Sequence, residues 1–227
     1  MNLVDPADRK TYGQMCALAM AMDRVGDRWT VLILRELLAG PARFGELRAS
    51  LPGIATNLLT NRLREMADDG LVDKTGTGQA TRYELTDTGA AIRPALEALG
   101  QWGHMLGPRG RADPVTNARS FAMPLTVMLT RAAEAGAELG DEPIHLEIAG
   151  ADLRITGGSS PLVESGAPEQ PAAVVRSTIE AMSALLMQGS YSDELLELVD
   201  GDPTAVARLS EVLAVIAASA PTPAWAE

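Results

Sequence analysis

The chain has 227 residues, of which 46% are hydrophobic and 22% charged, and its formal net charge is -11. This length allows one or two domains with a sizeable core, and no apolar run is long enough to span a bilayer. The single cysteine excludes an internal disulfide framework, and the N-terminus lacks the apolar stretch of a secretion signal, so we expect a cytoplasmic protein.

The negative charge is distributed unevenly. Residues 1–111 hold 14 Lys+Arg and 13 Asp+Glu, a net of +1, whereas residues 112–227 hold 5 and 17, a net of -12. Such asymmetry predicts two domains, and a stretch rich in glycine and proline lies between the two halves. The predicted organisation is a first domain over 1–107, a linker over 108–114, a smaller second domain over 115–220 and a tail over 221–227.

Helical periodicity marks the start of the first domain. Apolar residues recur at helical spacing over 15–22 and 31–38, and Gly40-Pro41 ends the second of these helices. A short third helix is expected over 44–51. Pro52-Gly53 then forms a turn.

A longer helix and a hairpin follow this turn. Thr56 is expected to cap a helix that ends at Asp68. Two short strands, 71–72 and 83–85, enclose a glycine-rich tip, and residues 86–106 are expected to form one long helix. This order of elements is typical of a winged helix-turn-helix domain, which places one helix in a DNA groove.

The helix that begins at Thr56 has two different faces. Leu59, Leu63 and Met66 form an apolar stripe that core packing alone explains. Its other faces carry amide, hydroxyl and guanidinium groups, which hydrogen-bond base edges and phosphates, so we favour double-stranded DNA as the partner over an ordinary amphipathic helix. The candidate DNA contacts, including two cations of the hairpin and one residue before the third helix, are Arg43, Thr56, Asn57, Thr60, Asn61, Arg64, Lys74 and Arg82.

Few other residues suggest chemistry. Cys16 stands among the apolar residues of the first helix, where it is either a small buried hydrophobic residue or a reactive thiol. His104 and His145 have no neighbours at metal-ligand spacing. We therefore expect no metal, no cofactor and no catalytic site.

The second domain combines strands and helices. Alternating apolar residues predict a hairpin over 144–156 and short strands at 174–175 and 198–199. Amphipathic helices are expected over 124–133, 179–186 and 203–216. The fold class is therefore mostly α with α+β: a winged helix followed by a smaller α+β domain with an antiparallel sheet.

The predicted core of this second domain is rich in leucine and methionine. Such side chains either pack against one another or line an adaptable pocket for an apolar ligand. The residues that would line such a pocket are Leu125, Met128, Leu129, Leu153, Ile155, Met182, Leu185 and Leu186.

Residues 16–102 resemble the HxlR-type winged-helix regulators, a branch of the MarR-like group. The matching motifs are Val25-Gly26-Asp27-Arg28-Trp29, Gly40-Pro41, Arg43-Phe44-Gly45-Glu46-Leu47, Leu63-Arg64-Glu65-Met66 and Tyr83-x-Leu85-Thr86-x-x-Gly89. The family's usual Cys-Pro opening is Cys16-Ala17 here, and its usual lysine before the tryptophan is Arg28. The resemblance implies a homodimer, built through the first and the last helix of the domain, on a palindromic operator.

The same resemblance makes Cys16 a candidate redox-sensing residue. Some HxlR-type relatives sense oxidants or electrophiles with a cysteine at this position. Because this chain has no second cysteine, a disulfide would have to join two protomers or Cys16 and a small thiol.

Residues 115–217 resemble the sterol carrier protein type-2 domain. The segments that carry this resemblance are 144–156, 173–189 and 199–209. It implies an apolar tunnel for a lipid or another hydrophobic molecule. The leading hypothesis is therefore a homodimeric DNA-binding transcriptional regulator modulated by an apolar small molecule, and the alternative is a lipid-carrier or scaffold protein that uses the winged helix mainly for dimerisation.

Overall fold

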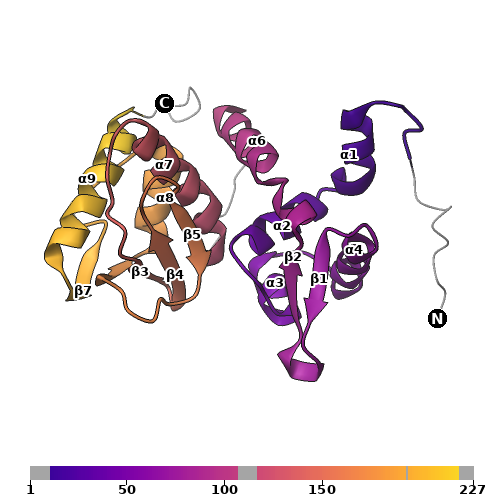
Figure 1. The fold of residues 1–227 in the computed structure, drawn as a ribbon, viewed down its shortest axis with the longest axis horizontal. Coiled ribbons are helices and arrows are strands. Elements are labelled where there is room, and N and C mark those ends of the chain that lie inside the picture. Colours follow the sequence, from indigo (N-terminus) through magenta and orange to yellow (C-terminus); the bar gives the residue numbers. More distant parts are fainter. Residues whose placement is uncertain (1–10, 107–116, 193, 220–227) are drawn as a thin grey trace. The chain divides into compact units, whose positions relative to one another are not determined.

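The computed structural model describes residues 11–106, 117–192 and 194–219 (Figure 1). The chain divides into two compact units, Met1–Leu37 with Ala42–Ala90 and Leu38–Pro41 with Ala91–Glu227. The second unit thus includes residues 91–106, which we had expected in the first domain, and it is the larger of the two. The expected linker and tail lie outside the described residues. Among the described helices, none has the length and apolar character needed to cross a membrane.

The first unit is a helix-turn-helix with a two-stranded wing, as the sequence predicts. Strands β1 (Val72–Thr75) and β2 (Arg82–Leu85) pair antiparallel around the short 3-10 turn η2 (Gly78–Ala80). Ala55, and not the expected Thr56, is the N-cap of the helix before the wing. The helices of this unit are α1 (Ala17–Val25), α2 (Thr30–Leu38), α3 (Phe44–Ser50), α4 (Thr56–Asp68) and α5 (Asp87–Ala90).

Helices α2, α3 and α4 supply most of the core of the first unit. The largest fully buried side chains there are Ile33, Leu34, Leu47, Leu59, Leu63 and Met66. Helix α1 is different, because Val25 is its one buried residue. Its apolar side chains are exposed instead, with Met15 just before it at 104% and Leu18 at 68%.

The single helix expected over 86–106 is two helices, α5 and α6 (Arg93–Leu106). Pro94 explains the break. Its ring nitrogen has no hydrogen to donate to the carbonyl of Ala90, four residues earlier, so the helical ladder is interrupted there.

The start of α5 is tied to the segment that follows α4. The Thr86 hydroxyl donates to the Gly70 carbonyl at 2.7 Å and accepts the backbone N–H of Gly89 at 3.0 Å. A Cβ on Gly89 would lie 2.0 Å from the Leu71 carbonyl oxygen, so only glycine fits. The Thr86-x-x-Gly89 motif therefore keeps the start of α5 packed against residues 70–71, which lead into the wing.

The second unit contains one five-stranded sheet, in the order β5-β4-β3-β6-β7. The sheet is mixed, and not antiparallel as expected, because β3 and β6 run parallel. Strand β5 was not predicted from the sequence. The remaining elements are η3 (Ala118–Phe121), α7 (Ala122–Glu134), β3 (Ile144–Ile148), β4 (Ala151–Thr156), β5 (Leu162–Ser165), β6 (Ala173–Ser177), α8 (Ile179–Gln188), β7 (Glu197–Gly201) and α9 (Pro203–Ser219).

One face of this sheet carries the core of the second unit. Helices α7, α8 and α9 lie beside the sheet (Figure 1). Alternate residues of β3, among them Ile144 and Leu146, are buried with apolar residues of these helices. The opposite face carries polar pairs, including Arg154–Glu164 at 2.6 Å. A sheet that is covered on one side and polar on the other explains the alternation in the sequence.

Candidate nucleic-acid interface

Helix α4 separates its apolar and polar side chains as the sequence predicts. Leu59, Leu63 and Met66 are buried. The five predicted DNA contacts of this helix are all exposed, namely Thr56, Asn57, Thr60, Asn61 and Arg64. The buried stripe thus fixes which face of the helix is turned outward.

The outward face is a hydrogen-bonding surface. The Thr60 hydroxyl donates to the Thr56 carbonyl at 2.9 Å, so its oxygen remains an acceptor for an outside donor. The Arg64 guanidinium approaches the Asn61 side-chain oxygen at 3.4 Å, a long contact. Asn61 and Arg64 therefore lie side by side, with donors and acceptors suited to base edges.

Arg43 is brought to the wing by a short backbone bridge. Ala42 and Tyr83 exchange two backbone hydrogen bonds, of 2.9 Å and 2.8 Å, which extend the β-hairpin to the start of α3. Arg43 then precedes α3, and its backbone N–H donates to the Glu46 carboxylate at 2.7 Å. The Arg43 side chain is exposed.

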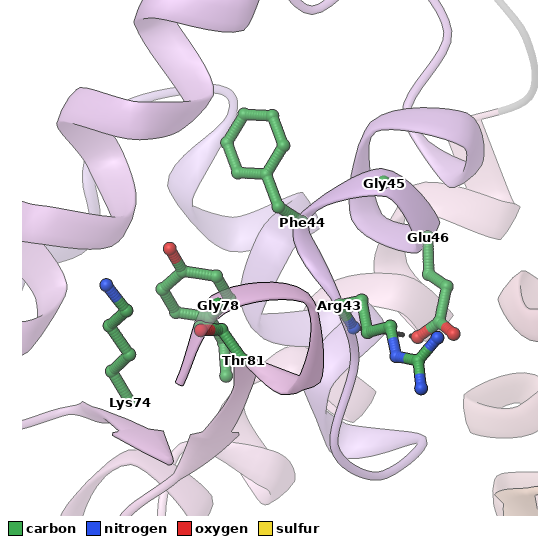
Figure 2. Close-up of a pocket in the computed structure, with 8 residues that line it drawn as sticks. Arg43, Phe44, Gly45, Glu46, Lys74, Gly78 and Thr81 are labelled. Atoms are coloured by element: carbon green, nitrogen blue, oxygen red, sulfur yellow. Dashed lines mark hydrogen bonds between the residues drawn. The ribbon is translucent and has the colours of Figure 1, made fainter. Parts of the chain in front are cut away.

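A hollow of about 670 Å³ lies between α3 and the wing. Its lining includes Arg43, Phe44, Lys74, Thr81 and Tyr83. Figure 2 shows the side chains of Lys74 and Arg43 on opposite sides of Thr81. Two cations, Arg43 and Lys74, and one carboxylate, Glu46, thus line a hollow next to the helix-turn-helix.

The two predicted cations of the wing, Lys74 and Arg82, do not lie on the same face of the hairpin. Lys74 pairs with Tyr83 across the hairpin, whereas Arg82 pairs with Thr75. Residues directly opposite each other share a face, and successive residues alternate, so Lys74 and Arg82 lie on opposite faces of the wing. Lys74 is exposed beside the hollow, and Arg82 is half-buried.

Sequence reasoning missed Arg62, which lies on the inner side of α4. Its guanidinium Nη2 donates to the Asp27 carboxylate at 3.0 Å, and its Nη1 donates to Glu65. The spacing of Arg62 and Glu65 could have indicated a pair within the helix. Asp27 is 35 residues away, so no local pattern could have indicated that contact.

Cys16 is exposed and is the N-cap of α1, which corrects the interpretation of a buried hydrophobic residue. The backbone N–H groups of Ala19 and then of Leu18 lower the pKa of the Cys16 thiol, although neither forms a hydrogen bond of ordinary geometry with it. Both donors belong to the free N-terminal turn of the helix. The thiol is therefore both accessible and more acidic than usual.

The residues expected to line an apolar pocket belong to the core of the second unit. Six of the eight are buried, and Met128 and Leu186 pack against them. Two hollows in the described residues lie elsewhere, one at the wing and one beside Glu147 and Arg176. At these positions the side chains belong to one apolar core cluster.

The sheet register brings three possible metal ligands together on the open face of β3 and β4. The ligating atoms of His145, Glu147 and Asp152 lie within 4.8 Å of one another. Each group, however, has a protein partner: His145 Nε2 lies 2.9 Å from Asp152, and Glu147 accepts from Arg176 at 2.8 Å. These contacts form a polar ladder across three strands, and we assign the cluster no metal.

Comparisons with known proteins give matches to the first part of the chain. A family model described as HxlR-like helix-turn-helix matches residues 24–110. An uncharacterized HTH-type transcriptional regulator of Methanothermobacter thermautotrophicus is 33% identical over 96 residues, which cover 41% of this chain and 73% of the relative. The uncharacterized HTH-type transcriptional regulator YvaP of Bacillus subtilis is 36% identical over 93 residues, covering 39% of this chain and 86% of YvaP.

Among solved structures, the reduced form of the transcriptional regulator YodB from B. subtilis is 27% identical. The match covers 43% of this chain and all of that one, with a TM-score of 0.37. The segment that the family model matches, residues 24–110, contains α2, α3, α4 and the wing, and the two HTH-type relatives are covered over 73% and 86% of their length. The chain therefore belongs to the HxlR-like helix-turn-helix family of transcriptional regulators.

Proposed function

We propose that the first unit binds double-stranded DNA in a sequence-specific manner by inserting α4 into the major groove. The observation that carries this proposal is the exposed face of α4, where Asn57, Asn61 and Arg64 lie opposite a fully buried stripe. An asparagine amide pairs with adenine through two hydrogen bonds, and an arginine pairs in the same way with guanine. Membership of a helix-turn-helix regulator family supports the same function.

In this arrangement the remaining cations hold the DNA backbone. Arg43 and Lys74 line the hollow beside the wing, where a phosphate would meet two cations and the carboxylate of Glu46. Contacts to phosphates position the protein without reading the sequence. Arg82, on the other face of the wing, is the weaker candidate.

The direct test is to select binding sequences from a pool of random DNA duplexes with the full-length protein. We expect enrichment of a two-fold symmetric sequence, here called the operator, which binds at least about 1,000-fold more tightly than a random duplex of equal length. The affinities are measured by fluorescence anisotropy. A protein that enriches no sequence, or binds all duplexes alike, would contradict the proposal.

We also propose that the regulator is a homodimer. Two helices carry exposed apolar side chains that the described residues leave uncovered: Leu18, Met20 and Met22 on α1, and Leu99, Trp102, Met105 and Leu106 on α6. Apolar patches of this kind mark protein interfaces. A two-fold dimer would present two copies of α4 about 34 Å apart, the spacing of successive major grooves on one side of DNA.

Replacing Lys74 by alanine should weaken binding to every duplex by a similar factor. Loss of one phosphate contact per protomer should reduce the slope of log affinity against log salt concentration by about 0.9 per contact. A salt series with the operator and with a random duplex measures both quantities. Arg82→Ala is the matched control and should change the slope less, and a slope for Lys74→Ala equal to that of wild type would contradict the assignment.

We propose Cys16 as the position at which oxidants or electrophiles reach this regulator. Its lowered pKa means that the thiolate, the reactive form, is present at lower pH than for an ordinary cysteine. The rate of alkylation by iodoacetamide should therefore rise at lower pH in the native protein than in the same protein unfolded in urea. Because Cys16 is the only cysteine, Cys16→Ser provides the blank. Equal midpoints in the native and unfolded protein would refute a special reactivity.

For the second unit we propose an accessory role as a folded scaffold of the regulator. The sequence predicts a sterol-carrier-like domain that holds an apolar ligand, and the expected lining residues, such as Leu125, Leu153 and Leu185, are buried in one core cluster. An apolar molecule could enter there only if these side chains moved apart. A ligand could then alter DNA binding only through unequal affinity for two arrangements of the dimer.

A further inference from the structure

Arg62 is the only one of the α4 arginines that turns toward its own protein. Its side chain is 25% exposed, and its guanidinium joins two carboxylates, Asp27 in the loop before α2 and Glu65 one turn further along α4. Arg64, by contrast, is exposed on the outer face. The two arginines of one helix thus have different surroundings.

The Arg62 guanidinium stays charged between the carboxylates of Asp27 and Glu65. Burial lowers its pKa, but the hydrogen bond and charge of Glu65, together with those of Asp27, outweigh burial and raise the pKa above its ordinary value. Its Nε is buried without a hydrogen-bond partner. With two carboxylates beside it, the group offers little net positive charge to a phosphate, so we do not count it among the DNA contacts.

Asp27 connects this pair to the rest of the helix-turn-helix. Its second carboxylate oxygen accepts the backbone N–H of Trp29 at 2.8 Å. The Trp29 ring in turn reaches the turn between α3 and α4, where its edge lies 3.9 Å from the position of a Cβ on Gly53. The loop before α2 therefore contacts α4 in its middle, at Arg62, and also the turn that leads into it.

These contacts contribute little to the free energy of unfolding, because ion pairs between side chains that are a quarter to a third exposed are weak. Their geometry has another consequence. They restrain the rotation and the tilt of α4, and a site that reads bases tolerates errors of only about 0.5 Å or 10–20°. Non-specific binding depends on charge and tolerates such errors.

We propose that Arg62 is a positioning residue for DNA recognition: held between Asp27 and Glu65, it fixes the orientation of α4 and so determines how well the regulator distinguishes its operator from other DNA. The proposal rests on the proposed function of α4. Arg64 then contacts the DNA bases, whereas Arg62 sets the orientation of α4.

The test compares Arg62→Met with wild type on the operator and on a random duplex, across a salt series. Methionine retains much of the apolar stem and removes the charge. We expect operator affinity to fall by about 10-fold or more, in the range of one lost base contact, while random-duplex affinity and the salt slope stay within about twofold of wild type. Arg62→Lys, which keeps the charge and one hydrogen bond, should restore part of the discrimination.

Two further variants keep the test decisive. Asp27→Asn retains the acceptor for Trp29 and weakens the ion pair, so it should reduce discrimination, and combining it with Arg62→Met should add little. Arg24→Met removes the same charge from α1 and should change nothing. Should Arg62→Met be unfolded in a thermal melt, Asp27→Asn and Arg62→Lys are judged by the same ratio.

Two results would overturn the proposal. Equal loss of operator and random-duplex affinity in Arg62→Met would make Arg62 a phosphate contact, and unchanged discrimination in folded Arg62→Met or Asp27→Asn would leave it without a role in recognition. Failure of the proposed function is a separate result, because wild-type protein would then select no operator at all.

Discussion

Replacing Thr60, Asn61 and Arg64 together by alanine is expected to lower affinity for the operator by at least about 100-fold. Each base pair read through two hydrogen bonds contributes roughly 1–3 kcal/mol of discrimination, and a dimer makes each contact twice. All three residues are exposed, and alanine is a good helix former, so the fold should be retained. Anisotropy titrations of the operator and a random duplex measure the loss.

The random duplex should lose far less affinity than the operator in this triple variant, because Lys74 and Arg43 still attract phosphates. Asp68→Ala, on an exposed position at the C-terminal end of α4, is the matched control and should keep full discrimination. If the triple variant discriminates as wild type does, α4 is not the recognition helix and the proposed function falls with it.

The periodicity of α4 made this helix predictable from the sequence. Its apolar residues repeat at helical spacing, and the structure confirms its bounds, Thr56–Asp68. The N-cap was the weak point, because threonine is favoured there but Ala55 occupies the position without a side-chain hydrogen bond. Local preference is a modest term, and buried Ile54 and Leu59 on either side fix the start of the helix instead.

Features that depend on residues far apart in the sequence were not predictable, whereas features set by neighbouring residues were. The break between α5 and α6 could have been inferred from Pro94, since the lost hydrogen bond is a local effect. The pairing of Arg62 with Asp27, by contrast, joins residues 35 positions apart. No pattern of spacing indicates such a contact, so Arg62 and Asp27 could not be paired from the sequence.

The second unit illustrates the same limit for a sheet. Its hairpin, β3 and β4, follows from alternation, but the parallel pairing of β3 with β6 depends on where the chain crosses after β5. Alternation also identified the buried leucines without stating what they face. In the structure these leucines are buried together in one core cluster.

Trp102→Glu is expected to convert the regulator into a monomer and to weaken operator binding by about 100-fold or more. Trp102 is 58% exposed on α6, and Leu99, Met105 and Leu106 extend the same apolar surface along the helix. A carboxylate at its centre would have to be buried without a partner in any dimer formed there, which is strongly unfavourable. Sedimentation velocity at micromolar concentration measures the assembly.

The loss of DNA affinity follows from geometry. A dimer binds two half-sites as one unit, and linking two binding modules raises the overall affinity by about 10²–10⁴. A monomer that reads one half-site loses this gain, although its α4 is unchanged. Affinity for a DNA fragment with a single half-site should therefore be the same in Trp102→Glu and wild type at concentrations where both are monomeric.

Gln101→Glu provides the matched control, since it adds the same charge to the neighbouring exposed position of α6. It should remain a dimer, because a shift of one residue turns the side chain about 100° away from Trp102 around the helix. A Trp102→Glu protein that stays dimeric would place the interface elsewhere, for example on the exposed apolar side chains of α1. A monomeric Trp102→Glu protein that binds the operator as tightly as wild type would show that recognition does not depend on two copies.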